Sequence, residues 1–175
     1  DSLDKVKDVF WFVIFKYFIY LCNMIHVYNI HTEDHTNCGE NECNFYCGRH
    51  KNKDTKRNDN PLGNPFTHNG VRTSIASLSF KTREEAIDAF GEYFDEMYGK
   101  DEELTSAFDE IYENYKNGKE IWLGCFCKPK SCHCDIIADR LQRKLIKEKL
   151  KELKDVKSWI DILSVQIFFV SLQQN

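Results

Sequence analysis

The 175-residue sequence predicts a small single-domain α/β layered fold, in which a short, mostly parallel sheet is flanked by helices and apolar helical extensions stand at both ends. Three observations predict it. Short runs of strand-forming residues alternate with long amphipathic stripes of helical period. Residues 120–126 (EIWLGCF) are short and apolar, which is typical of a central strand buried on both faces. The order strand, strand, loop, helix, helix, strand, helix is that of a compact layered domain.

Two strands are expected early in the domain, at residues 26–30 (HVYNI) and 44–47 (NFYC), the second ending at Gly48. The chain from 49 to 60 is highly polar and indicates a solvated loop. Residues 61–66 (PLGNPF) follow, where two prolines fix the backbone and Gly63 permits a conformation that other residues avoid. This segment predicts a rigid corner.

Three helices are expected in the second half. Thr82 and Glu85 form a capping box that begins an apolar stripe, and Gly99 ends it. Asp101 caps a second stripe, which a left-handed turn at residues 117–118 closes. Pro129 breaks the strand that follows. The third helix is expected to begin at Asp135 and to run to residue 153.

The apolar runs at 9–21 and 159–172 lie outside this domain. Each is shorter than the roughly 20 residues of a membrane span, and no small-residue cleavage site follows the first, so membrane insertion and a signal peptide are disfavoured. One interpretation is that Met24 is the natural start of the protein and that the residues before it are an extension. The predicted division is therefore 1–24, 25–153 and 154–175, with the apolar ends packing on the domain or joining copies of the chain into a homo-oligomer.

Charge and cysteine content narrow the class of protein. A formal net charge of −4 gives no bulk attraction to nucleic acid, so general DNA or RNA binding is disfavoured. The eight cysteines fall into two clusters, Cys38, Cys43 and Cys47, and Cys125, Cys127, Cys132 and Cys134, with Cys22 apart. Neighbours as close as Cys132 and Cys134 rarely bridge each other. Reduced thiols in a cytoplasmic protein, or a metal site, are expected rather than a disulfide scaffold.

The turn between the last strand and the last helix is the first candidate site. Ligands of open α/β sheets lie beyond the carboxyl ends of strands, where the first amides of a helix favour phosphate or carboxylate. Lys128 and Lys130 add positive charge for ligand binding. Cys132, His133 and Asp135 are the candidate catalytic residues, since a thiol at a helix start ionises easily and a neighbouring imidazole can act as acid or base. For Asp135, a helix cap is the simpler interpretation.

Gly48, Arg49, Gly63 and Asn64 are the other candidate ligand-binding residues. The guanidinium of Arg49 suits planar recognition of phosphate or carboxylate. Backbone amides of the corner, together with Asn64, can contact the same ligand, although the segment can also be only a corner. We expect the segment at 48–49, the corner at 61–66 and the turn at 127–135 to converge on one pocket.

These motifs resemble a known family. The segments FYCGR at 45–49, PLGNPF at 61–66 and LGCFCKPKSCH at 123–133, followed by Asp135, are similar to the domain of unknown function 4326 of bacteria and their phages. The resemblance covers about residues 25–145. The family usually has glycine where this chain has Cys134. The resemblance implies a site and no particular reaction.

Zinc is a candidate cofactor, with Cys127, Cys132 and His133 as its predicted ligands, because zinc prefers thiolate and imidazole. The alternative is that these are buried or site-lining thiols, since the spacings are not those of a zinc ribbon. On one continuous strand, Cys125 and Cys127 would share a face.

The function expected first is binding of a nucleotide, nucleoside or similar small anionic molecule, with or without its conversion. The alternatives are a non-catalytic nucleotide-binding module and a Cys/His zinc-binding interaction protein. The sequence contains no phosphate loop, dinucleotide fingerprint or serine-hydrolase elbow.

Overall fold

The structure is a computed structural model that describes residues 24–35, 38–50, 58–69 and 76–152. The chain divides into two units, Asp1–Leu141 and Gln142–Asn175. In the second unit the described residues are 142–152, all helical. The predicted apolar helical extensions lie outside the described residues. In the described part of the chain, none of the helices combines the length and apolarity that crossing a bilayer requires.

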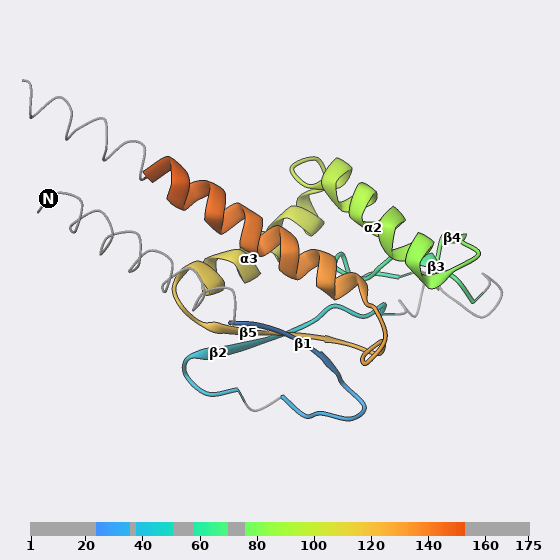
Figure 1. Cartoon of the computed structure of the whole chain (residues 1–175), viewed down its shortest axis with the longest axis horizontal. Helices are drawn as coiled ribbons and strands as arrows, with labels where there is room; N and C mark the ends of the chain where they lie inside the picture. The colour runs from blue at the N-terminus through green and yellow to red at the C-terminus, as the bar shows by residue number, and fades with distance from the viewer. Residues whose placement is uncertain (1–23, 36–37, 51–57, 70–75, 153–175) are drawn as a thin grey trace, which may run out of the picture. The chain divides into compact units, whose positions relative to one another are not determined.

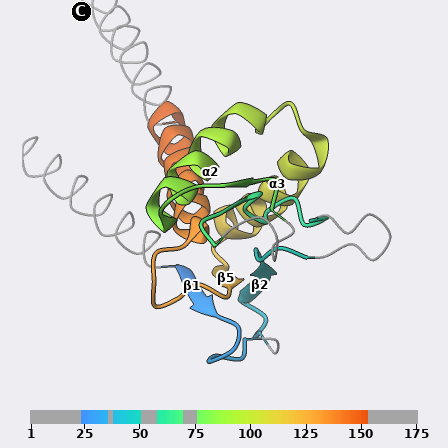
Figure 2. The ribbon, with the colours of Figure 1, turned by 90° about the vertical axis from the view of Figure 1, so that its right-hand side faces the viewer.

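The main sheet has three parallel strands, in the order β1 (Ile25–Asn29), β5 (Glu120–Cys125), β2 (Glu42–Tyr46). The register pairs Ile25 with Ile121 on one side of β5, and Glu42 with Glu120 on the other. Figures 1 and 2 show α2 and α3 on one side of this sheet. The prediction of a small α/β fold with a short, mostly parallel sheet is confirmed, as is the central place of β5.

A second, smaller sheet pairs β3 (Phe66–Thr67) with β4 (Leu78–Ser79), also in parallel. Each strand has two residues, which is too short to leave an alternating pattern in the sequence. The pair was therefore not predicted. β3 begins at the end of the proline-bounded corner, and β4 lies shortly before α2. The pair therefore connects the corner to the first long helix.

Helix α2 (Arg83–Met97) begins at the predicted capping box. The Glu85 amide donates to Thr82 Oγ1 at 3.1 Å, and the Thr82 amide donates to Glu85 Oε2 at 3.2 Å. Helix α3 (Glu102–Lys116) begins after Asp101, whose carboxylate accepts from the Leu104 amide at 3.0 Å. Gly99 follows α2 with a φ of 85°, in the left-handed region that glycine enters without strain.

The last helix begins at residue 133, two residues before the predicted start. Asp135 lies inside its first turn, where the carboxylate accepts from the Cys132 amide at 3.0 Å and pairs with Lys128 Nζ at 2.8 Å. The prediction that Asp135 begins the helix is wrong, because the chain turns into the helix directly at Cys132. Asp135 still satisfies an amide that the helix itself leaves unpaired.

The core lies between the sheet and the helices. Ile121 and Leu123 of β5 are fully buried, and Phe94 of α2 meets Phe108 of α3 edge to face at 5.0 Å between ring centroids. Strand β5 is less buried than expected on its other face. There Trp122 is half-buried, and its ring stacks with the imidazoles of His26 and His35, at 4.3 and 3.7 Å between ring centroids.

Candidate functional site

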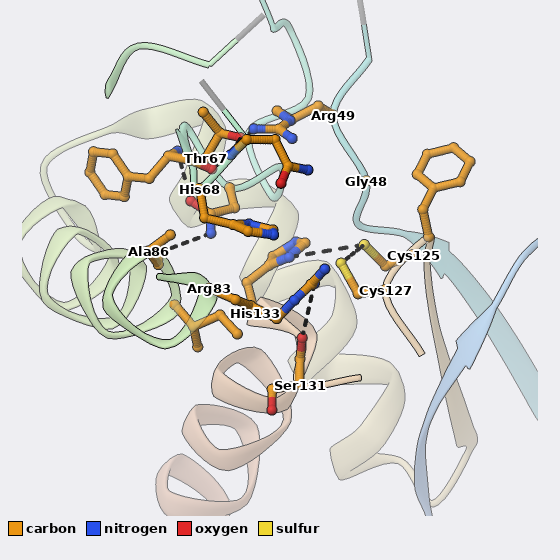
Figure 3. Close-up of a pocket in the computed structure, with 15 residues that line it drawn as sticks. Gly48, Arg49, Thr67, His68, Arg83, Ala86, Cys125, Cys127, Ser131 and His133 are labelled. Atoms are coloured by element: carbon orange, nitrogen blue, oxygen red, sulfur yellow. Dashed lines mark hydrogen bonds between the residues drawn. The ribbon is translucent and has the colours of Figure 1, made fainter. Parts of the chain in front are cut away.

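A cavity of about 520 Å³ opens where β2 and β5 end. Gly48 and Arg49 line it after β2, and Cys125 to Cys127 line it at the end of β5. The rest of the lining comes from Asn64 and residues 66–69, from Arg83, Ala86 and Ile87 at the start of α2, and from Ser131 and His133 (Figure 3). The three segments that the sequence singled out therefore lie around one cavity. The roles assigned to their residues stay predictions.

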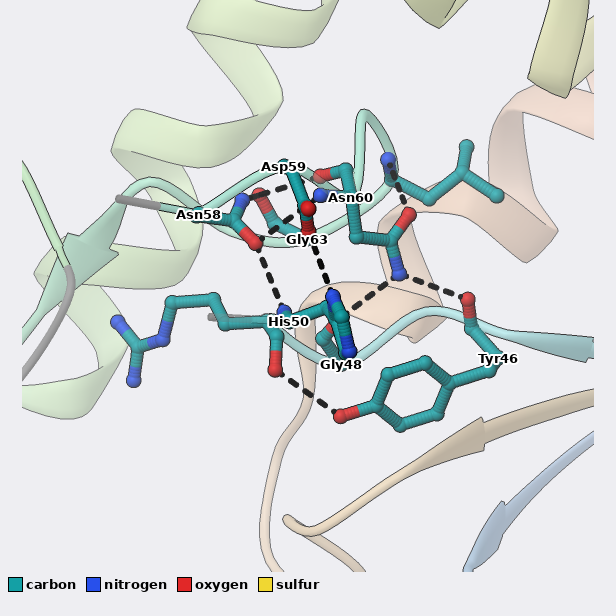
Figure 4. Close-up of polar contacts among 9 residues, drawn as sticks. Tyr46, Gly48, His50, Asn58, Asp59, Asn60 and Gly63 are labelled. Atoms are coloured by element: carbon teal, nitrogen blue, oxygen red, sulfur yellow. Dashed lines mark hydrogen bonds and ion pairs between the residues drawn. The ribbon is translucent and has the colours of Figure 1, made fainter. Parts of the chain in front are cut away.

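Two asparagines hold the corner against the segment that follows β2 (Figure 4). Asn60 Nδ2 donates to the carbonyls of Tyr46 and Gly48, at 2.9 and 2.7 Å. Asn58 Oδ1 accepts from the His50 amide at 2.9 Å, while its Nδ2 donates to the Gly63 carbonyl at 3.2 Å. Both residues were missed in the sequence. The available signal was that asparagine favours turns because its side chain hydrogen-bonds nearby backbone.

The two candidate glycines are required for space. A side chain on Gly48 would collide with the ring of Tyr46. A Cβ atom on Gly63 would lie 2.9 Å from Asn58 Nδ2 and 3.1 Å from the Arg49 Cα atom. Neither glycine is among those with positive φ. Gly63 lies outside the lining of this cavity.

Asn64 lines the cavity and is buried, with 9% of its surface exposed. Its Oδ1 atom accepts from the Phe66 amide at 2.8 Å, and its Nδ2 atom donates to the Ala86 carbonyl at 3.1 Å. The side chain therefore ties the corner to the first turn of α2.

The guanidiniums of Arg49 and Arg83 line the cavity together with the imidazole of His68. Arg49 Nη1 donates to the Phe66 carbonyl at 3.0 Å, and Arg83 Nη1 donates to the Ser131 carbonyl at 3.4 Å. Among the described residues, neither guanidinium has a carboxylate partner, and the described lining contains no acidic residue. Burial, and then the charge of Arg83, lower the pKa of His68 below its ordinary value. The cavity is therefore electropositive.

Arg83 and His68 were not among the predicted site residues, because nothing local in the sequence marks them as facing this cavity. The predicted Lys128 and Lys130 lie outside its lining. Lys128 pairs with Asp135, and Lys130 is exposed. The positive charge expected at the turn after β5 is supplied to the cavity by arginines from two other segments.

A buried group of three thiols and one imidazole adjoins the cavity, and two of its members, Cys125 and His133, belong to the cavity lining. Its members are Cys125, Cys132, His133 and Cys134, whose sulfur and nitrogen atoms all lie within 4.8 Å of one another. Such a group can hold a metal ion. It shares Cys132 and His133 with the predicted set. Cys127 lies outside it, half-buried, with its Sγ atom 3.7 Å from Cys125 Sγ.

His133 is held in one orientation. Its Nε2 atom lies 2.7 Å from the Cys47 carbonyl oxygen, so the proton on Nε2 is donated there. The Nδ1 atom faces the sulfurs of Cys132 and Cys125, at 3.7 and 4.0 Å. Burial lowers the pKa of His133, but the hydrogen bonds to Cys125 and Cys132 outweigh it and raise that pKa well above the ordinary value.

The thiols of the group share their protons unequally. Hydrogen bonds from Cys127, and then from Cys132 and Cys134, lower the pKa of Cys125 strongly. The bond with Cys125 raises the pKa of Cys132, but bonds from Cys127 and Cys134 bring it down to about 6. The pKa of Cys127 is raised by its bond to Cys125, and that of Cys134 is raised by burial. Cys125 and Cys132 thus favour the thiolate, the form of cysteine that binds metals, and Cys134 favours the thiol.

Comparisons with known proteins place the chain in a family. Searches of curated proteins and of solved structures found no match. One family model matches residues 30–143, a stretch that contains every residue of the cavity lining and of the Cys/His group. The chain therefore belongs to the family described as Domain of unknown function (DUF4326).

Proposed function

We propose that this protein binds a small anionic metabolite of the nucleotide or nucleoside-phosphate class in the cavity. The observation that carries the proposal is the convergence of Arg49, Arg83 and His68 on a cavity whose described lining has no acidic side chain. Guanidinium groups recognise phosphate and carboxylate through paired, charge-assisted hydrogen bonds. A volume of about 520 Å³ also falls in the ordinary range for small-molecule sites.

Each guanidinium is oriented by one hydrogen bond and keeps other N–H donors for a ligand. Each donates to a backbone carbonyl, Arg49 to Phe66 and Arg83 to Ser131. A guanidinium carries several further N–H donors in a fixed planar array. The protein thus orients each cation through one bond and leaves other donors for an anion between them.

The aromatic side chain of Phe126 favours a ligand with a planar ring over a bare anion. It lines the cavity while 46% of its surface is exposed, so part of the ring faces solvent. Stacking of a nucleobase on an aromatic side chain contributes about 1–3 kcal/mol. Phosphate held by the arginines and a base on Phe126 would use both kinds of lining.

Binding without conversion fits the site better than catalysis. Of the residues predicted to be catalytic, only His133 lines the cavity. Cys132 is buried with 1% of its surface exposed, and Asp135 pairs with Lys128. A catalytic residue must reach the reacting atoms, and these two side chains are engaged elsewhere.

Calorimetric titration of the full chain with adenosine monophosphate tests the proposal, with inorganic phosphate and adenosine as separate arms. We expect the monophosphate to bind most tightly. Arg49→Ala and Arg83→Ala should each weaken it by about tenfold to a hundredfold, because each removes a charge-assisted bond of about 1.5–3 kcal/mol. Arg143→Ala, an exposed arginine outside the lining, is the control. The proposal would be refuted if none of the three probes binds, or if both cavity variants bind the monophosphate as tightly as the natural chain does.

A second candidate function is that of a zinc-binding interaction protein. The observation favouring it is the buried group of Cys125, Cys132, His133 and Cys134, whose donor types are those of structural zinc. Metal analysis of the purified chain tests it. A chain that contains no zinc, and takes up none when zinc is supplied, would exclude this function.

A further inference from the structure

The Cys/His group joins the segments that build the cavity. Cys125 ends β5, and residues 132–134 enter the last helix. The Cys47 carbonyl, which accepts from His133 Nε2, directly precedes Gly48 and Arg49. Whatever holds this group together therefore also sets the positions of the cavity walls.

We propose that Cys125, Cys132, Cys134 and the Nδ1 atom of His133 bind one zinc ion in a closed tetrahedral site, and that this ion fixes the walls of the cavity. The first statement stands on the group alone. The second rests on the proposed function, because its readout is binding of the anionic ligand.

The donor atoms are already spaced for such an ion. Zinc–sulfur bonds of about 2.3 Å and zinc–nitrogen bonds of about 2.0 Å place neighbouring tetrahedral donors roughly 3.5–3.8 Å apart. Here His133 Nδ1 lies 3.7 Å from Cys132 Sγ and 4.0 Å from Cys125 Sγ. All four donors lie within 4.8 Å of one another, so small side-chain adjustments suffice.

The imidazole presents the correct nitrogen. Because Nε2 lies 2.7 Å from the Cys47 carbonyl and donates its proton there, loss of the other ring proton leaves the lone pair on Nδ1, which faces the sulfurs of Cys132 and Cys125. A metal-binding histidine usually donates its other ring N–H to a carbonyl or carboxylate, which fixes its tautomer and orientation. The Cys47 carbonyl is that partner.

The surroundings favour a closed structural site. The four ligands are buried, with between 0% and 5% of their surfaces exposed. The Cys134 amide donates to Cys132 Sγ at 3.4 Å, which stabilises a thiolate at the start of the helix. On binding, the thiol protons and the Nδ1 proton of His133 leave to solvent, and the thiolates and the imidazole give their electron pairs to zinc, so the step needs no oxidant or reductant. Four protein ligands leave no open position, as in structural zinc sites.

Cys127 is the nearest competing thiol, 3.7 Å from Cys125 Sγ. It is half-buried and lines the cavity, whereas Cys134 is fully buried among the other donors. Cys134 is therefore the zinc ligand and Cys127 is not. Loss of the Cys134 thiol should weaken zinc binding, and loss of the Cys127 thiol should not.

The first experiment measures metal content in the full chain, purified without chelator, by mass spectrometry. We expect one zinc ion per chain in the natural sequence, in Cys127→Ser and in the remote control Cys38→Ser. Cys132→Ser and Cys134→Ser should lose most of it. An absence of zinc before and after reconstitution, or full zinc content in both ligand variants, would overturn the site. So would a disulfide found between any of the four cysteines 125, 127, 132 and 134 in freshly purified protein.

Cobalt substitution keeps the test valid if a ligand variant fails to fold. Metal-free natural chain is titrated with Co²⁺, whose absorption reports thiolate ligation and tetrahedral geometry without any mutation. We expect sulfur-to-cobalt charge-transfer bands and strong visible bands that disappear when zinc is added. Weak visible bands typical of six oxygen or nitrogen ligands would overturn the proposal.

The link to the cavity is tested with adenosine monophosphate on zinc-loaded and metal-free chain. We expect metal removal to weaken binding by about tenfold or more, while Arg49→Ala should keep its zinc and lose the ligand. Equal binding with and without metal would refute the link and leave the zinc site standing. A zinc-loaded chain that binds no nucleotide or phosphate would instead refute the proposed function.

Discussion

His68 lies among the cationic groups of the cavity, and its protonation should depend on the ligand. Burial lowers the pKa of His68 most. The positive charges of Arg83, Arg49 and Lys130 lower this pKa further, and the negative charge of Glu84 opposes them. A bound anion would offset the arginines and raise that pKa. By linkage, binding should then take up a proton and tighten as the pH falls towards the lowered pKa of the free His68 side chain.

Nuclear magnetic resonance titration of the His68 ring, with and without adenosine monophosphate, measures this shift. His26, which stacks on Trp122 at the opposite face of the sheet, is the internal control and should not respond to the ligand. An unchanged His68 titration at saturating ligand would mean that the anion binds elsewhere.

Asn64 is the side chain that couples the corner to α2. Asn64→Ala removes its bonds with the Phe66 amide and the Ala86 carbonyl inside a buried region. Leaving such groups unpaired costs about 1–3 kcal/mol of unfolding free energy. Urea unfolding measures the loss. Asn69→Ala, at an exposed position of the same lining, is the matched control and should change stability by a few tenths at most.

At the scale of single elements, β5 tolerates no side chain at Gly124. A Cβ atom there would lie 2.8 Å from Tyr28 Oη and 2.9 Å from the Ile30 Cγ2 atom. Gly124→Ala should therefore destabilise the chain by about 1–3 kcal/mol through overpacking. Tyr28→Phe removes the hydroxyl in question, so the double variant should lose less than the sum of the single losses. Additive losses in thermal unfolding would show that the hydroxyl does not clash.

Elements whose signals are local were predictable. The capping box of α2 depends on residues three apart, and both of its hydrogen bonds form. The central place of β5 followed from its apolar run, because the middle strand of a parallel sheet is the most buried. The pair of β3 and β4 was missed, since two-residue strands leave no periodicity.

The composition of the Cys/His group could not be predicted for a different reason. Side chains alternate along a strand, so Cys125 and Cys127 would share a face only if β5 continued. It ends at Cys125, and Cys127 lies beyond it. Cys134 joins the group because the last helix begins at residue 133, earlier than the sequence indicated. Arg83 and His68 escaped notice because their convergence depends on how distant segments pack.

At the scale of the whole molecule, the apolar ends remain a prediction about assembly. Residues 9–21 and 159–172 are rich in large hydrophobic side chains, and a large apolar patch that a folded chain leaves exposed drives association. We expect the full chain to form homo-oligomers and a chain of residues 24–152 to be monomeric. Light scattering coupled to size-exclusion chromatography distinguishes the two. Monomers at all concentrations of full chain would disprove the expectation.

The strand order also constrains how the protein acquires its shape during synthesis. β5 inserts between β1 and β2, so among the described strands neither early strand has its partner until β5 has left the ribosome. Pairing of Ile25 with Ile121 closes a long loop, and sheets built from such distant contacts assemble slowly. Nascent chains that end before Cys125 should therefore carry unpaired strand edges and depend on chaperones.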